Sequence, residues 1–121
     1  MKKVLIVDDQ LGIRMLLTEL LKKDGYETQQ AANGREALAL LGKESFHLIL
    51  LDMKIPGMNG IEILREIRQR LPSIQVMMMT AYGELEMMEE ARNLGVLHYF
   101  AKPFDVEEIR HEVNKVLRDV V

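Results

Sequence analysis

The chain has 121 residues, of which 48% are hydrophobic and 29% are charged, and its formal net charge is −3. This balance is typical of one soluble globular domain and excludes a disordered or fibrous chain. A mildly acidic chain is a poor nucleic-acid binder, because that affinity comes largely from cations on phosphates. The absence of cysteine excludes disulfides, thiolate metal sites and cysteine nucleophiles. Without a signal peptide or a membrane-length apolar run, we expect a cytoplasmic protein that does not contact membranes.

Five short apolar runs predict strands, because each has the length of a buried strand. Consecutive apolar positions are covered on both faces, which is typical of a parallel sheet. The second run is polar enough to fit only at a sheet edge. The runs are Val4–Val7, Thr28–Ala32, Leu48–Leu51, Val76–Met79 and Tyr99–Ala101.

Amphipathic stretches with helical spacing lie between and after these runs. Asn33 and Gly34 introduce the second helix, Pro72 stops the third, Gly95 stops the fourth, and Asp105 is the expected N-cap of the last. The apolar positions of the five helices lie within Ile13–Leu21, Ala37–Leu41, Ile61–Leu71, Leu85–Leu94 and Ile109–Val120.

The alternation of strand and helix predicts an α/β fold, a doubly wound parallel sheet of five strands in the order 2-1-3-4-5. Five strands are too few for a closed eight-stranded barrel. We expect residues 1–121 to form a single domain, with no output or DNA-binding domain.

Polar side chains stand at the ends of four predicted strands. Asp8 and Asp9 follow the first strand, Asp52 the third, Thr80 the fourth and Lys102 the fifth. In an open sheet of this order these ends meet where the strand order reverses, so the side chains should converge. An aspartate at one strand end is usually a turn or cap residue, but the joint pattern favours a site.

The residue types indicate phosphoryl chemistry. Three neighbouring carboxylates repel one another unless a cation neutralises them, and oxygen-only ligands suit Mg²⁺, with Mn²⁺ as a substitute. A carboxylate beside Mg²⁺ and a lysine is suited to accept a phosphoryl group, because both cations stabilise charge on the transferring group. The hydroxyl of Thr80 is placed to bond a phosphoryl oxygen.

Three other functions fit these residues less well. An FMN-binding protein would share the strand order, but two carboxylates after the first strand repel a bare phosphate. An aspartate-based phosphohydrolase normally carries a second aspartate two residues after its nucleophile, and position 54 is lysine. An interaction module that has lost its chemistry would not carry the complete set of acids with Thr80 and Lys102.

The segments VLIVDDQ, LLDMKIPGMNG, MMTAYGE and YFAKPF resemble those of response-regulator receiver domains, and the similarity covers the whole chain. The longer segments AANGREAL and FAKPFDVEEIR resemble in particular the single-domain receivers of sporulation phosphorelays. The resemblance implies the flavodoxin-like (βα)5 receiver fold and membership of a two-component regulatory system.

The resemblance also implies a role for each acidic residue. Asp52 matches the aspartate that is phosphorylated. Asp8 and Asp9 match the pair that holds Mg²⁺, with Asp9 a direct ligand and Asp8 acting largely through water. Lys54 matches the position that lends its backbone carbonyl to the metal.

Three further residues match positions that respond to the phosphoryl group. Thr80 and Lys102 match the hydroxyl and ammonium that bind it. Tyr99 matches the aromatic switch position, where the sporulation receivers carry histidine. This departure leaves the switch behaviour open and does not affect the chemistry.

The implied function is that of a phosphorelay intermediate. It accepts a phosphoryl group from a sensor histidine kinase onto Asp52 and passes it to a histidine phosphotransferase in sporulation initiation. It is an enzyme only in catalysing its own phosphorylation and dephosphorylation. Aspartyl-phosphate phosphatases are further partners, and we expect a monomer that binds no nucleic acid. The alternative is a diffusible regulator that binds a target when phosphorylated, as in chemotaxis.

Helix geometry predicts the partner surface. At 100° per residue, Leu11 and Met15 fall opposite the residues expected to face the core, which are Ile13, Leu16, Leu17 and Leu20. The first helix and the segment after Lys102 border the rim that carries the acids, where a donor histidine must approach in line. The residues expected to form or border the contact are Leu11, Gly12, Ile13, Met15, Pro103 and Phe104, with Ile13 partly shared with the core.

Overall fold

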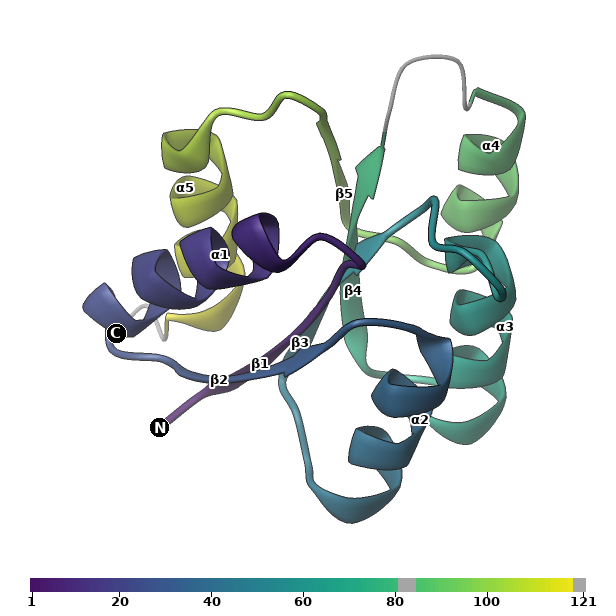
Figure 1. Cartoon of the computed structure of the whole chain (residues 1–121), viewed down its shortest axis with the longest axis horizontal. Coiled ribbons are helices and arrows are strands. Elements are labelled where there is room, and N and C mark those ends of the chain that lie inside the picture. The colour runs from purple at the N-terminus through teal and green to yellow at the C-terminus, as the bar shows by residue number, and fades with distance from the viewer. Residues whose placement is uncertain (81–84, 119–121) are drawn as a thin grey trace.

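The computed structural model describes residues 1–80 and 85–118. For residues 85 and 86 it describes the backbone but not the side chains. It shows one parallel sheet of five strands in the order β2-β1-β3-β4-β5, with helices on both faces (Figure 1). The architecture and strand order predicted from the sequence are thus confirmed. The strands are β1 (Lys3–Val7), β2 (Glu27–Ala31), β3 (Leu48–Asp52), β4 (Gln75–Thr80) and β5 (His98–Ala101). The helices are α1 (Leu11–Lys23), α2 (Gly34–Lys43), α3 (Gly60–Arg70), α4 (Leu85–Asn93) and α5 (Val106–Leu117).

The sheet separates two hydrophobic clusters, which explains the uninterrupted apolar runs. In β1, Leu5 and Val7 pack in the cluster that α2, α3 and α4 cover, whereas Val4 and Ile6 pack in the cluster under α1 and α5. All four are fully buried. Successive side chains of a strand point to opposite faces, so a strand covered on both faces must be apolar at every position.

The edge strand β2 shows the contrast. Its residues Glu27 and Gln29 are exposed, and only Ala31 is buried. β2 pairs with β1 in parallel, from Lys3 with Glu27 to Val7 with Ala31. The polar run is therefore an edge strand, as predicted, and it begins and ends one residue earlier than expected.

Side chains cap three of the helices. The Asn33 side chain accepts a hydrogen bond from the backbone of Glu36, and Asn59 accepts one in the same way at the start of α3. The Asp105 side chain accepts from the backbone of Glu107, so the predicted N-cap of α5 is confirmed. These caps satisfy backbone N–H groups that a helix leaves unpaired in its first turn.

The expected orientation of Leu16 is wrong. Its side chain is 47% exposed, and Thr18 is buried in the same helix. Leu17 and Leu21 supply the fully buried positions of α1, so its core-facing stripe is narrower than the apolar pattern indicated. Leu16 therefore belongs to the exposed apolar face of α1.

At the other end of the chain, α5 ends at Leu117, and Val120 lies outside the described residues.

Arg68 joins α3 to the segment that follows α4, at the edge of the sheet where the strands begin. Its Nε atom donates to the carbonyl of Leu94 at 2.5 Å, and its Nη2 atom donates to that of Gly95 at 3.4 Å. Its Nη1 atom donates to the carbonyl of Ile74 at 2.5 Å. Burial lowers the pKa of Arg68 from its usual value. One side chain thus satisfies carbonyls from two separate turns.

Of the helices described, none is both long and apolar enough to cross a membrane.

Candidate phosphoryl-acceptor site

Four strands deliver side chains to one rim of the sheet. Asp8 follows β1, Asp52 ends β3, Thr80 ends β4 and Lys102 follows β5. β1 and β3 are neighbours, as are β3 with β4 and β4 with β5, so these strand ends are adjacent in space. The topology alone brings together residues as far apart as Asp8 and Lys102, which lie 94 positions apart in the sequence.

Lys102 bridges two buried carboxylates. Its Nζ atom lies 3.1 Å from Oδ2 of Asp8 and 3.1 Å from Oδ2 of Asp52. Asp9 is exposed beside them, and one oxygen from each of the three aspartates lies within 4.8 Å of the others. Three carboxylates against one ammonium leave two negative charges uncompensated, which a hard cation with oxygen ligands can neutralise.

Backbone groups fix the two buried carboxylates. Oδ1 of Asp8 accepts from the backbone of Gln10 at 2.9 Å, and Oδ1 of Asp52 accepts from the backbone of Lys54 at 3.3 Å. The Lys54 side chain is exposed, so only its backbone takes part in this arrangement. Each carboxylate thus has one oxygen held by the chain and the other directed to Lys102.

Arg14 contributes to the site from α1, which the sequence pattern did not indicate. Its Nη1 atom donates to the Asp8 carbonyl at 2.8 Å, and its Nε atom donates to the Gln30 side chain at 3.2 Å. An arginine in the polar stripe of a helix carries no sequence signal for such a role.

Burial and charge shift the pKa values of the site. Burial, with a smaller contribution from the neighbouring Asp8, raises the pKa of Asp52 to about 6, although Lys102 opposes this shift. Burial lowers the pKa of Lys102, but the carboxylates of Asp52 and Asp8 outweigh it and raise that pKa overall. Lys102 is therefore a firmly charged ammonium, and Asp52 is less readily ionised than an exposed aspartate.

Thr80 and Tyr99 occupy neighbouring strands but point to different surroundings. Thr80 is buried at the site, and its carbonyl accepts from the backbone of Lys102 at 2.7 Å. Tyr99 pairs with Met78 and its hydroxyl donates to the carbonyl of Met88, in α4, at 3.1 Å. Burial raises the pKa of Tyr99. The aromatic side chain is thus held against α4.

The residues expected at a partner surface lie beside this rim. Leu11 is 59% exposed and Met15 is 55% exposed, while Ile13 is partly buried against the cluster under α1 and α5. Pro103 follows Lys102 through a cis peptide bond and is exposed. Phe104 is half-buried against the same cluster. Gly12 is also exposed.

The family description "Response regulator receiver domain" matches residues 4–114. The chain belongs to the response regulator receiver family. Sporulation initiation phosphotransferase F of Bacillus subtilis (strain 168) is 58% identical to this receiver over 96% of this chain and 94% of that protein. Regulatory protein AtoC of Escherichia coli (strain K12) is 38% identical over 96% of this chain, which spans 25% of that protein. The sequence resemblance to receivers, and to a sporulation receiver in particular, is confirmed.

Solved structures give the same result for the fold. Vibrio cholerae chemotaxis protein CheY4 matches this receiver with a TM-score of 0.89 at 34% identity, over 97% of this chain and 99% of that chain. A receiver domain protein from Methanospirillum hungatei matches with a TM-score of 0.91 at 33% identity, over 95% of this chain and 92% of that chain.

Proposed function

We propose that this receiver accepts a phosphoryl group on Asp52 from a phosphohistidine and passes it to a histidine phosphotransferase in sporulation initiation. The observation that carries the acceptor role is the pair of 3.1 Å contacts that Lys102 makes with Asp52 and Asp8. The 58% identity with sporulation initiation phosphotransferase F supports the place in a sporulation relay. A sensor histidine kinase supplies the group, and aspartyl-phosphate phosphatases remove it.

The acidic cluster fits Mg²⁺, which would be held by Asp8, Asp9, Asp52 and the backbone carbonyl of Lys54. All these ligands are oxygens, and two carboxylate charges are left over once Lys102 is counted. When bound, the metal ion supplies positive charge next to the transferring group.

The chain's own residues perform the transfer. An oxygen of the Asp52 carboxylate attacks the phosphorus, the phosphorus–nitrogen bond breaks, and its electron pair stays on the imidazole nitrogen of the donor. The Lys102 ammonium then binds a phosphoryl oxygen in place of the Asp52 carboxylate, and the Thr80 hydroxyl donates to another. Both groups stabilise charge that grows on the phosphoryl oxygens, which is how positioned donors lower such barriers. In this limited sense the receiver is a phosphotransferase.

We further propose that the switch runs from Thr80 to Tyr99. When Thr80 moves toward the phosphoryl group, it leaves room for the Tyr99 side chain on the neighbouring strand. Tyr99 then changes its rotamer and loses its hydrogen bond to the Met88 carbonyl. Amide resonances of β5 should shift on phosphorylation in an NMR titration. Shifts confined to the loops around Asp52 would contradict this coupling.

The proposed partner surface consists of Leu11, Gly12, Ile13, Met15, Pro103 and Phe104. These residues lie on the rim from which a donor histidine reaches Asp52, and Leu11 and Met15 expose apolar area that no part of the described core covers. An apolar patch beside a reactive group is suited to an apolar helix face of the protein that carries the histidine.

A diffusible regulator is the second candidate, because chemotaxis protein CheY4 is similar over 99% of its own length.

Both candidates require that Asp52 accept a phosphoryl group, and a mass measurement tests this step. The receiver incubated with Mg²⁺ and acetyl phosphate should gain one phosphoryl group, whereas Asp52→Asn should gain none. A full gain in Asp52→Asn would refute the assignment.

Transfer to a partner separates the two candidates. The phosphorylated receiver, freed of acetyl phosphate, is mixed with a histidine phosphotransferase of a sporulation relay. A relay intermediate loses its phosphoryl group to that protein within seconds to minutes. Retention of the group, with binding to another target, supports the diffusible regulator instead.

A further inference from the structure

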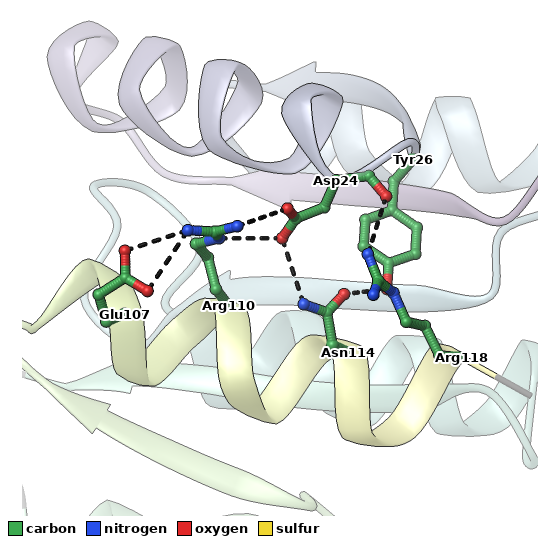
Figure 2. Close-up of polar contacts among 6 residues, drawn as sticks. All are labelled: Asp24, Tyr26, Glu107, Arg110, Asn114 and Arg118. Carbon is green, nitrogen blue, oxygen red and sulfur yellow. Dashed lines mark hydrogen bonds and ion pairs between the residues drawn. The ribbon is translucent and has the colours of Figure 1, made fainter. Parts of the chain in front are cut away.

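A partly buried polar cluster joins the end of α1 to α5 (Figure 2). Its centre is Asp24, the C-cap residue of α1, whose side chain is only 6% exposed. Arg110 binds this carboxylate with two nitrogens, at 2.8 Å from Nη2 to Oδ1 and 3.0 Å from Nε to Oδ2. Asn114 donates to Oδ2 at 3.2 Å and accepts from the Tyr26 hydroxyl.

The α5 side of this cluster is a single stripe of side chains. Arg110 and Asn114 are four residues apart, so they lie one above the other on α5, and Arg118, the C-cap residue, follows four residues later just past the end of the helix (Figure 2). All three reach Asp24, because Arg118 donates to the Asp24 carbonyl at 3.5 Å. A slide of α5 by one turn, about 5.4 Å, would leave the buried carboxylate facing the wrong side chains.

The apolar packing of α5 does not resist such a slide in the same way. Its fully or almost fully buried positions are Ile109, Val113 and Leu117, which also repeat every four residues. All three are aliphatic, so a shift by one turn places an aliphatic side chain where another stood at two of the three positions. The polar side chains differ from one another and share a single partner, Asp24. Their contacts therefore determine the position of α5 along α1.

Local helix physics gives no reason for an aspartate at this position. The C-terminus of a helix carries partial negative charge, which disfavours a carboxylate there and favours the lysines at 22 and 23. Buried ion pairs are, in addition, often no more stabilising than apolar side chains of the same size. What the Asp24 cluster adds is a defined arrangement of α1 and α5.

This arrangement controls the two halves of the proposed partner surface. Met15 lies on α1, nine residues before Asp24, and Phe104 lies six residues before Arg110 in the segment that leads into α5. Any slide or rotation of α5 changes the position of Phe104 relative to Met15. A partner that contacts both residues with one rigid helix needs that position to be fixed.

We propose that Asp24, Arg110 and Asn114 are positioning residues for recognition of the phosphohistidine partner. They hold α5 in one place along α1, so that Phe104 and Met15 present one rigid surface. This inference rests on the proposed function, because it assumes that these two halves of the rim meet the phosphohistidine protein.

The main test variant is Asp24→Leu/Arg110→Met, which replaces the ion pair by apolar side chains. Its matched control is Arg65→Met/Glu90→Leu, which removes an exposed ion pair between α3 and α4. Nitroxide labels on Glu19→Cys and His111→Cys, both exposed, report the α1–α5 distance by pulsed electron resonance, since the chain has no other cysteine. The probe for recognition is a histidine kinase autophosphorylated with labelled ATP.

In the Asp24→Leu/Arg110→Met variant we expect a shifted or broadened label distance and at least a tenfold higher KM for the receiver in transfer from the kinase. The maximal rate should change less than threefold, and phosphorylation by acetyl phosphate less than twofold. The control pair should match wild type in every assay. Arg110→Lys keeps the charge but loses the two-nitrogen contact, so it should also raise KM in a receiver that still folds.

Three results would overturn the proposal. The first is an unchanged label distance, and the second is a changed distance with an unchanged KM. The third is an equal loss with acetyl phosphate, which would place the damage at Asp52. If the wild-type receiver takes no phosphoryl group from any histidine kinase, the proposed function itself fails, and the label distance then reports only on the α1–α5 arrangement.

Discussion

Gly60 lies directly against the backbone of Asp52. A β-carbon on Gly60 would stand 2.5 Å from the Asp52 carbonyl oxygen and 2.5 Å from Cα of Met53. The backbone of Gly60 also donates to the Met53 carbonyl at 2.8 Å. The first turn of α3 is thus packed onto the end of the strand that carries Asp52, and only glycine permits this approach.

Gly60→Ala should lower the free energy of unfolding by about 2 kcal/mol, because the added methyl group meets backbone that cannot move aside without shifting Asp52. Urea unfolding measures the loss. Gly42→Ala is the matched control, since a β-carbon there meets nothing within 4 Å, and it should stabilise the fold by about 0.5–1 kcal/mol. Equal effects of the two changes would show that the close approach is unimportant.

Arg68→Met should destabilise the receiver by about 2 kcal/mol, because the carbonyls of Leu94 and Ile74 lose a charged donor. Thermal and urea unfolding both report this change. Arg70→Met serves as the control, since Arg70 is exposed and its one ion pair with a described residue is a 3.8 Å contact with Glu66. Its effect should stay within about 0.5 kcal/mol. A similar loss in both variants would argue against the role of the Arg68 contacts.

Asp9→Asn should stabilise the metal-free receiver by about 1 kcal/mol, because it removes one of three carboxylates that repel one another across the site. The same change should weaken Mg²⁺ binding at least tenfold. Calorimetry in the absence of metal and a Mg²⁺ titration followed by NMR measure the two effects. Unchanged Mg²⁺ affinity would remove Asp9 from the ligand set.

Asp24 should make the receiver sensitive to acid. The hydrogen bond from Arg110 holds the pKa of Asp24 below its usual value. The unfolded chain therefore takes up the proton first as the pH falls, and the stability that the ionised Asp24 provides above about pH 4 is lost below it. Urea unfolding between pH 3 and pH 6 should show a shallower acid loss in Asp24→Asn. Glu19→Gln, an exposed control, should follow the wild-type profile, and a wild-type profile in both would contradict this account.

Met15→Lys and Phe104→Ala should each reduce transfer from a phosphohistidine protein at least tenfold, about 1.4 kcal/mol, while acetyl phosphate labelling stays near wild type. Both changes affect the proposed partner surface and neither alters Asp52. Leu97→Lys is the matched control, because Leu97 is a similarly exposed apolar residue at 50%. Losses with both donors would indicate damage to the site, and no loss with either would exclude this surface.

The sequence predicted the strand-end residues from local patterns, and the sheet order from the alternation of strands and helices along the chain. Apolar runs mark covered strands, and Asp52 can be placed on the rim once its strand is known. The contacts of Arg68 and Arg14 could not be predicted, because a long cation on a helix surface can reach many carbonyls and nothing in the spacing selects one. Leu16 was misplaced for a related reason, since helical periodicity gives the apolar face but not how much of it the neighbouring helix covers.

The bridge between Asp8 and Lys102 also has a consequence during synthesis. Asp8 is made at the start of the chain, and Lys102 arrives 94 residues later with the last strand. Until β5 has left the ribosome and joined the sheet, the carboxylates of Asp8 and Asp52 lack the Lys102 ammonium that bridges them. If Asp52 accepts a phosphoryl group as proposed, a nascent or truncated receiver that lacks Lys102 should therefore not compete with finished molecules for phosphoryl groups.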